Sequence, residues 1–210
     1  KLLFPIPTNV KESEDTLKIP FEKDWNSRAA SQVKNQGLCT GAWAFAAAGA
    51  LEGLAALETS IVSNFSAQQL IDCSTEYGNQ GCNGGNIENS FWYVIDKGIT
   101  TDTQYPYTGQ QQNCSYTEAK KVFQNSECAN IKPNSTRALE SALVEQPVAV
   151  MVSSNSLGFQ LYRRGIFSGK CGTVANHGMV LIGYAKCMNR NIGNAKIHGD
   201  WPGANRDIFS

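Results

Sequence analysis

Small and apolar residues dominate the stretch from residue 42 to residue 58, AWAFAAAGALEGLAALE. Alanine and leucine are strong helix formers, so this stretch predicts a long α-helix. Because most of its side chains are small, we expect the helix to be packed tightly on all sides at the centre of the protein. Its longest apolar run, Trp43 to Leu57, is interrupted by Glu52 and is too short to span a bilayer.

Two further helices are predicted on either side of a glycine-rich loop. The segment SAQQLIDC begins with Ser66, a good N-cap residue, and the segment NIENSFWYVIDKG ends at Gly98. Between them lies GCNGG, residues 81–85, whose adjacent glycines predict a tight loop that another backbone can approach closely.

The character of the chain changes after about residue 125. One helix is predicted at 135–145, and three runs of β-branched and aromatic residues, PVAVMV, LYRRGIF and HGMVLIGYA, predict strands. A helical half followed by a strand-rich half predicts an α+β protein in two lobes. We therefore expect an extension or processing remnant at 1–18, a helical lobe at 19–125 and a strand-rich lobe at 126–210.

The charge of the chain narrows the classes of partner. Lysine and arginine number 18, as do aspartate and glutamate. No net charge therefore draws the protein to nucleic acid or to an anionic membrane. The first ten residues, KLLFPIPTNV, lack the apolar core of a signal peptide, and we expect a processed form.

Seven cysteines, at positions 39, 73, 82, 114, 128, 171 and 187, are dispersed along the chain. None forms a C-x-x-C pair, so we expect no structural zinc site, and no residue pattern implies a metal or an organic cofactor. Dispersed cysteines predict disulfides and an oxidising compartment. Three N-x-[ST] sequons, at Asn64, Asn113 and Asn134, fit a secretory route. Because the count is odd, at least one cysteine is free or paired between chains.

Several short motifs occur in an order that identifies a family. The chain reads VKNQGLCTGAW and AFAA, then LIDC, GCNGG, YPY, QPVAV, FQLYRRGIF and finally NHG followed by IGY. Together these motifs resemble the papain-like cysteine proteases of the cathepsin L and papain type, over residues 19 to 184. The resemblance implies a papain-like two-lobe fold, and the strands that complete the second lobe in the family are not recognised after Trp201, so we expect that lobe to be incomplete.

The family's signature around its nucleophile is C-G-[SA]-C-[WY], with a histidine about 130–150 residues downstream. This chain has Cys39-Thr40-Gly41-Ala42-Trp43, and His177 follows Ala42 by 135 positions. The resemblance thus places Ala42 where the nucleophilic thiol belongs. A methyl group cannot attack a carbonyl, so we expect no acyl-enzyme chemistry.

The remaining catalytic positions follow from the resemblance. Gln36 matches the oxyanion-hole glutamine and His177 the general base; without the motifs they would be interpreted as a solvated loop glutamine and an ordinary strand-edge histidine. The orienting asparagine aligns with Gly199, ahead of Trp201, and is therefore replaced. Asn189, Asn191 and Asn194 lie nearby without a tryptophan at the right offset. Thr40 replaces a glycine, which predicts a narrower first specificity pocket.

The resemblance also implies a substrate cleft and two disulfides. Gly84 and Gly85 would pair with an extended peptide backbone. The main specificity pocket would be lined by Asn86, Ile87, Met151, Asn176 and Gly178, with Trp201 beside the catalytic histidine; core packing is the alternative for Ile87 and Met151. The expected disulfides are Cys39–Cys82 and Cys73–Cys114, and a bridged Cys39 cannot serve as the nucleophile.

Three hypotheses for function follow. The first is a catalytically inactive papain-like protein that keeps a peptide-binding cleft. The second is an active endopeptidase in which Ala42 is an engineered Cys→Ala substitution. The third is an assembly subunit that uses the lobes only as packing surfaces. Because the nucleophile, the orienting asparagine, Thr40 and the C-terminal strands all depart together, the first is favoured, with a peptide or protein partner and a lysosomal, vacuolar or extracellular location.

Overall fold

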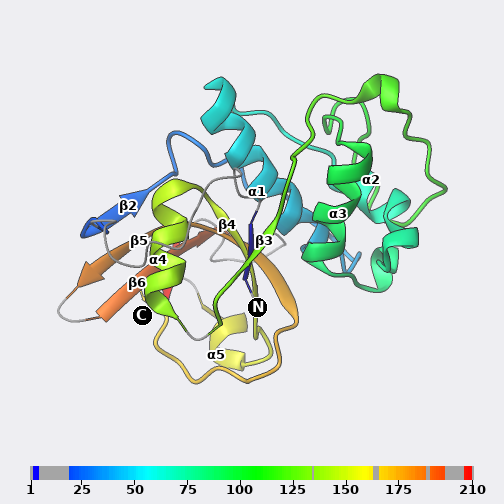
Figure 1. Ribbon diagram of the computed structural model, residues 1–210. Coiled ribbons are helices and arrows are strands. Elements are labelled where there is room, and N and C mark those ends of the chain that lie inside the picture. Colours follow the sequence, from blue (N-terminus) through cyan, green and yellow to red (C-terminus); the bar gives the residue numbers. More distant parts are fainter. Residues whose placement is uncertain are drawn as a thin grey trace.

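An 18-residue helix, α1 (Ala42–Thr59), runs through the middle of the molecule and separates the other large helices of the first half from the sheet (Figure 1). The computed structural model describes residues 2–4, 19–133, 135–162, 166–187, 190–196 and 206–209. Every α1 residue from Ala42 to Ala56 is buried. The predicted central helix is therefore confirmed.

The helical half is completed by α2 (Ala67–Cys73), α3 (Ile87–Lys97) and three short 3₁₀ helices: η1 (Thr75–Tyr77), η2 (Gly81–Asn83) and η3 (Glu118–Lys120). The predicted helix start at Ser66 and the predicted helix end at Gly98 are confirmed. The Ser66 hydroxyl accepts a hydrogen bond from the Gln69 N–H and caps α2, while Gly98, at φ 77°, ends α3. Helices α2 and α3 pack against α1.

The other half is an antiparallel sheet with two helices, α4 (Thr136–Glu145) and α5 (Leu157–Gln160). The strands are β1 (Leu2–Phe4), β2 (Glu22–Asp24), β3 (Ala129–Ile131), β4 (Val148–Val152), β5 (His177–Cys187), β6 (Arg190–Lys196) and β7 (Arg206–Phe209). Their order is β3-β1-β4-β5-β6-β7, with β2 paired to β5. The predicted helix at 135–145 and the predicted strands PVAVMV and HGMVLIGYA are confirmed as α4, β4 and β5.

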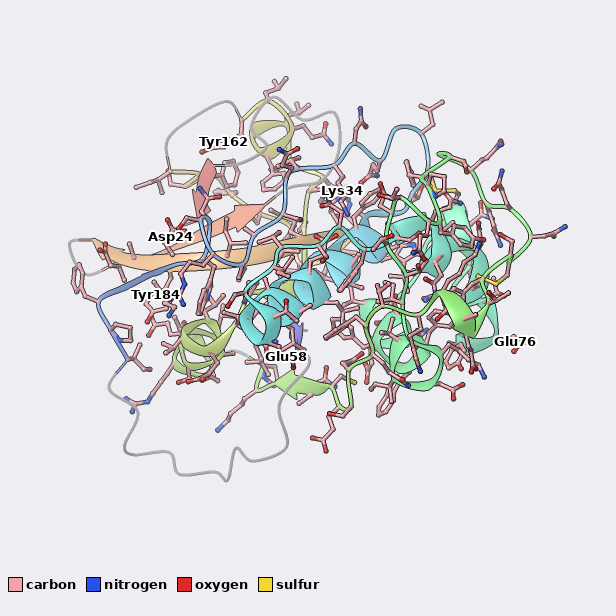
Figure 2. All side chains as sticks on the ribbon, turned by 90° about the horizontal axis from the view of Figure 1, so that it is seen from above. Asp24, Lys34, Glu58, Glu76, Tyr162 and Tyr184 are labelled. Atoms are coloured by element: carbon pink, nitrogen blue, oxygen red, sulfur yellow. A yellow bond between two sulfur atoms is a disulfide. The ribbon has the colours of Figure 1, made fainter. Side chains whose placement is uncertain are left out.

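The sheet also recruits segments that local patterns do not predict as strands. Strand β1, from the expected N-terminal extension, pairs with both β3 and β4, and β2 pairs with β5 although it falls within the range 19–125 expected for the helical lobe. Nearby, Tyr184 of β5, labelled in Figure 2, donates a hydrogen bond to the Pro20 carbonyl at 3.0 Å. These pairings depend on partners more than 100 residues away, which a local hydrophobic pattern cannot report.

The prediction of a strand at LYRRGIF is wrong for the described residues of that segment, which contain no strand. Its aromatic residues instead form a cluster with α5. The Phe167 ring packs edge-on against Phe159 and Tyr162, with ring centroids 5.4 and 6.0 Å apart, and all three side chains are buried. The apolar pattern of this segment therefore reflects aromatic packing in the core and not a strand.

Among the described residues, no helix is long and apolar enough to cross a membrane.

Candidate functional site

The site is organised around the first residue of α1. Ala42 is 5% exposed, and the preceding Gly41 provides no side-chain cap. The first N–H groups of an α-helix have no acceptor within the helix, so this end carries a partial positive charge. A β-carbon at residue 41 would lie 3.0 Å from Ile71 Cδ1 of α2, so α2 packs closely against the residue that precedes the helix. The sequence thus places a methyl group where the polarised end of α1 begins.

Strand β5 meets α1 at the same point. A β-carbon at Gly178 would lie 2.6 Å from the Ala42 carbonyl oxygen and 3.1 Å from Ala46 Cβ, so the strand backbone rests directly on the helix start. His177 is the first residue of β5 and pairs with Val152 of β4. The fold therefore brings the predicted general-base position next to the predicted nucleophile position.

Gln36 approaches α1 from the preceding loop. Its side-chain Nε2 donates a hydrogen bond to the Cys39 carbonyl oxygen at 3.2 Å, three residues before the helix begins. The backbone carbonyl of Gln36 accepts a hydrogen bond from the Tyr107 hydroxyl at 2.5 Å. A primary amide has two N–H donors, so the bond to Cys39 leaves one for a ligand. Gln36 thus lies in the loop just before α1, and its oxyanion-hole role stays a prediction.

A disulfide joins this loop to the glycine-rich loop. The structure contains both predicted disulfides, Cys39–Cys82 and Cys73–Cys114. The first is accompanied by a hydrogen bond from the Thr40 N–H to the Cys82 carbonyl at 3.2 Å. Thr40 itself is exposed. Because Cys39 is bridged, its sulfur is not available as a thiolate nucleophile.

The glycine-rich loop packs against the Trp43 ring and is exposed at Gly85. Gly84 has φ 124°, and nothing lies within 4 Å of the position that a β-carbon would take. At Gly85 a β-carbon would lie 2.5 Å from Trp43 Cε2 and 2.8 Å from Asn79 Oδ1. Gly85 is nevertheless exposed on its other side. Glycine is thus required at 85 by packing. The Gly84 N–H donates to the Gly81 carbonyl at 3.4 Å and the Gly84 carbonyl accepts from the Gln80 N–H at 2.9 Å, so both backbone groups of Gly84 are hydrogen-bonded within the loop.

The predicted pocket residues divide into three groups. Asn86 is exposed and caps α3 through a hydrogen bond from the Glu88 N–H to its side-chain oxygen. Met151 is partly buried and pairs with Gly178, so it lies beside the site. Ile87 is 1% exposed within the core of the helical half, so core packing, the alternative, replaces its predicted pocket role.

Asn176 precedes His177 and is turned toward the loop after β4. Its side-chain oxygen accepts hydrogen bonds from the N–H and the hydroxyl of Ser154, at 2.8 and 3.1 Å, and its amide nitrogen donates to the Asn155 side chain. Asn176 thus holds the start of β5 against that loop. Gly199, Trp201 and Asn189 lie outside the described residues.

Sequence reasoning missed the residues that hold the Gln36 loop. Glu52, which interrupts the apolar run of α1, is fully buried and accepts hydrogen bonds from Lys34 Nζ at 2.6 Å and from the Phe65 N–H at 2.7 Å. The Ser31 hydroxyl donates to the same carboxylate. Figure 2 shows Lys34 close to α1. A carboxylate in an otherwise apolar helix was the signal that could have identified this contact.

The fold and the site together define a class of protein. Two lobes meet at the N-terminus of a central helix, with an amide donor on one side and a histidine position on the other, which is the arrangement of a peptidase that uses a nucleophile at the helix start. The sequence profile of the papain family cysteine proteases matches residues 19–195, and the chain belongs to this family.

Individual relatives agree with this assignment. The chain is 40% identical over 174 residues to the cysteine protease Amb a 11.0101 of Ambrosia artemisiifolia, which covers 82% of this chain and 45% of that protein. It is 38% identical over 174 residues to vignain of Vigna mungo, covering 81% of this chain and 48% of the relative. The chain thus spans about half the length of the curated relatives it matches.

Solved structures confirm the predicted papain-like α+β fold. The crystal structure of the Amb a 11 proform superimposes with a TM-score of 0.84 at 35% identity, covering 92% of this chain and 61% of that one. Digestive procathepsin L 3 of the Tenebrio molitor larval midgut gives a TM-score of 0.88 at 29% identity, covering 98% of this chain and 69% of the other.

Proposed function

We propose that this chain is a papain-family protein that does not hydrolyse peptide bonds and that binds a peptide or protein segment in its cleft. The observation that carries the proposal is the methyl group of Ala42 at the first position of α1. Covalent catalysis needs an activated nucleophile at that position, and the sulfur of Cys39, three residues earlier, is held in a disulfide.

The parts of the cleft that contact a ligand without reacting with it support a binding role. Gln36 lies beside the start of α1 and Gly178 packs on Ala42. The free space over Gly84 gives room for an extended peptide, and the exposed backbone of Gly85 can pair with it in the manner of strand addition. The relatives are named as cysteine proteases, and we infer that this chain keeps their peptide-binding surface without their chemistry.

The same reasoning supports a location in the secretory pathway, either lysosomal or vacuolar or extracellular. Two disulfides in the helical half indicate folding in an oxidising compartment. The sequon asparagines Asn64 and Asn113 are exposed, so both can carry a glycan on the folded protein. Asn134, in the third sequon, lies outside the described residues.

Three measurements on the purified chain test the proposal. A fluorogenic dipeptide should not be hydrolysed, and a thiol-directed epoxide should leave no adduct on the peptides that contain Cys39 and Ala42. An acetylated, amidated hexapeptide with an apolar residue second from the cleavage position should bind in calorimetry. Hydrolysis or an adduct would contradict the inactive state, and absence of hexapeptide binding would contradict the binding role.

Matched variants at one exposed position locate the bound hexapeptide. Thr40 lies beside Ala42, and its N–H bond to Cys82 does not involve its side chain. If the peptide occupies the cleft, Thr40→Gly should tighten binding and Thr40→Tyr should weaken it. Binding that is equal in both variants would place the peptide elsewhere.

A further inference from the structure

The turn that carries Gln36 has little packing of its own. Gly37 has φ 55°, and nothing lies within 4 Å of the position that a β-carbon would take there. Leu38, at the next position, is fully exposed. Within the turn, the Gly37 N–H donates a hydrogen bond to the Asn35 side-chain oxygen at 2.7 Å. A turn that buries so little surface needs contacts from other elements to keep one conformation.

The Cys39–Cys82 disulfide anchors the chain after the turn, and two further contacts hold the turn itself. On the N-terminal side, Lys34 is held by the buried carboxylate of Glu52 and also donates to the Phe65 carbonyl at 3.1 Å. On the other side, the Tyr107 hydroxyl donates to the backbone carbonyl of Gln36 itself, across 71 positions of sequence.

Tyr107 is well placed to hold its partner. Its ring packs edge-on against Phe45 of α1, with ring centroids 4.9 Å apart. This contact holds the Tyr107 hydroxyl in a fixed position relative to α1, the helix whose N-terminus forms the site. Burial raises the pKa of Tyr107, which keeps the phenol protonated and able to donate.

We propose that Tyr107 is a positioning residue, which fixes the backbone of Gln36 so that its side-chain amide stays directed at the start of α1. The bond does not involve the side chain of Ala42, so the amide is preorganised whether or not a nucleophile is present. The inference rests on the proposed function only in assigning Gln36 to the ligand site; it does not depend on the absence of catalysis.

The decisive comparison is between two Tyr→Phe variants of the full chain. Tyr107→Phe removes the hydroxyl that binds Gln36, whereas Tyr116→Phe removes a hydroxyl that donates to the Lys97 carbonyl at 3.0 Å, away from the site. In NMR spectra of labelled protein, Tyr107→Phe should shift and broaden the Gln36 side-chain amide signals. Hydrogen exchange at the Gly37 amide should become about two- to tenfold faster, the factor expected for one lost hydrogen bond. Tyr116→Phe should change neither.

A conservative replacement provides the rescue. A p-aminophenylalanine at 107 keeps the ring and restores a donor, and it should return the Gln36 signals toward those of the parent chain. The indole N–H signal of Trp25, which bonds to Leu143 far from the turn, reports whether each variant is folded. If Tyr107→Phe does not fold, the rescue variant alone decides: Gln36 signals unlike those of the parent would overturn the inference.

The outcomes separate this inference from the proposed function. Unchanged Gln36 signals in Tyr107→Phe, or equal changes in both phenylalanine variants, would overturn the positioning role whatever the peptide data show. If the hexapeptide binds no variant at all, the proposed function fails, while the NMR comparison still decides the role of Tyr107. If both hold, Tyr107→Phe should weaken hexapeptide binding severalfold, and Tyr116→Phe should not.

Discussion

Gly178 and Ala42 are in such close contact that no side chain fits between them: a β-carbon at 178 would lie 2.6 Å from the Ala42 carbonyl oxygen and 2.9 Å from its carbonyl carbon. The contact joins the first turn of α1 to the start of β5, and through them the two halves of the molecule. It also fixes how far His177 stands from the helix. The geometry of the site therefore depends on a glycine that has no chemistry of its own.

Replacing that glycine should separate the strand from the helix. The backbone of α1 cannot yield as a flexible side chain would, so Gly178→Ala should lower the free energy of unfolding by about 1–3 kcal/mol. Urea denaturation followed by circular dichroism measures this change. Gly158→Ala in α5 is the matched control, because a β-carbon there would meet Phe167 at an ordinary 3.6 Å. Equal stability of the two variants would show that the contact with Ala42 is not close in solution.

The ion pair between Lys34 and the buried Glu52 carboxylate should contribute to stability. Glu52→Gln keeps an acceptor for the Phe65 N–H but leaves the Lys34 ammonium beside a neutral group, and breaking a buried pair costs about 3 kcal/mol. Replacing both members, Lys34→Met with Glu52→Gln, should recover part of the loss, because no uncompensated charge then remains. The same denaturation measurement tests both variants. A double variant less stable than Glu52→Gln would contradict the assigned pairing.

The two free cysteines among the described side chains should react at different rates. Cys171 is exposed, whereas Cys128 is partly buried, and burial together with the Glu88 carboxylate raises the pKa of the Cys128 thiol. Only the thiolate is alkylated, so iodoacetamide should label Cys171 first near neutral pH. Because a raised pKa means ionisation at higher pH, labelling of Cys128 should increase as the solution becomes alkaline. Peptide mapping after timed labelling measures both rates, and faster labelling of Cys128 at neutral pH would contradict this order.

Local patterns predicted the parts of the fold that local chemistry specifies. Ser66 and Ser135 cap helices, and Gly98 ends one, because capping involves residues within one turn of each other. The pairing of β1 with β3 and β4 could not be predicted in this way, since its partners are distant in sequence. The prediction of a strand around Phe167 is wrong for a different reason. Burial against α5 and burial in a sheet produce similar apolar runs in the sequence.

The candidate site was predictable where a motif carried it and not elsewhere. Ala42, His177 and Gln36 were placed by their spacing in the family pattern, and the structure brings their segments together. Nothing local to Tyr107 indicates that its hydroxyl reaches Gln36, and Ile87 follows the glycine-rich loop but points into the core. A motif predicts which positions form a site, whereas the contacts that hold those residues depend on the tertiary structure.

Restoring the thiol distinguishes a decayed site from an engineered one. Ala42→Cys places a nucleophile at the N-terminus of α1, where the helix dipole lowers the pKa of a thiol, and the proposed oxyanion donor Gln36 lies in the preceding loop. If Ala42 is the only change that removes activity, the Ala42→Cys variant should hydrolyse a fluorogenic dipeptide at nearly the rate of an active relative. The dipeptide carries an apolar residue second from the cleavage site. If Gly199 replaces the orienting asparagine, an asparagine no longer fixes the tautomer and direction of His177, and Thr40 obstructs the approach of the substrate. Misplacement by about 1 Å can cost about a hundredfold in rate. We therefore expect Ala42→Cys alone to be weakly active and Ala42→Cys with Gly199→Asn to recover more.

Ala42→Ser is the matched control, since it has nearly the same size but no thiol, and should stay inactive. Full activity of the single Ala42→Cys variant would contradict the decayed-site hypothesis and favour an engineered origin for Ala42.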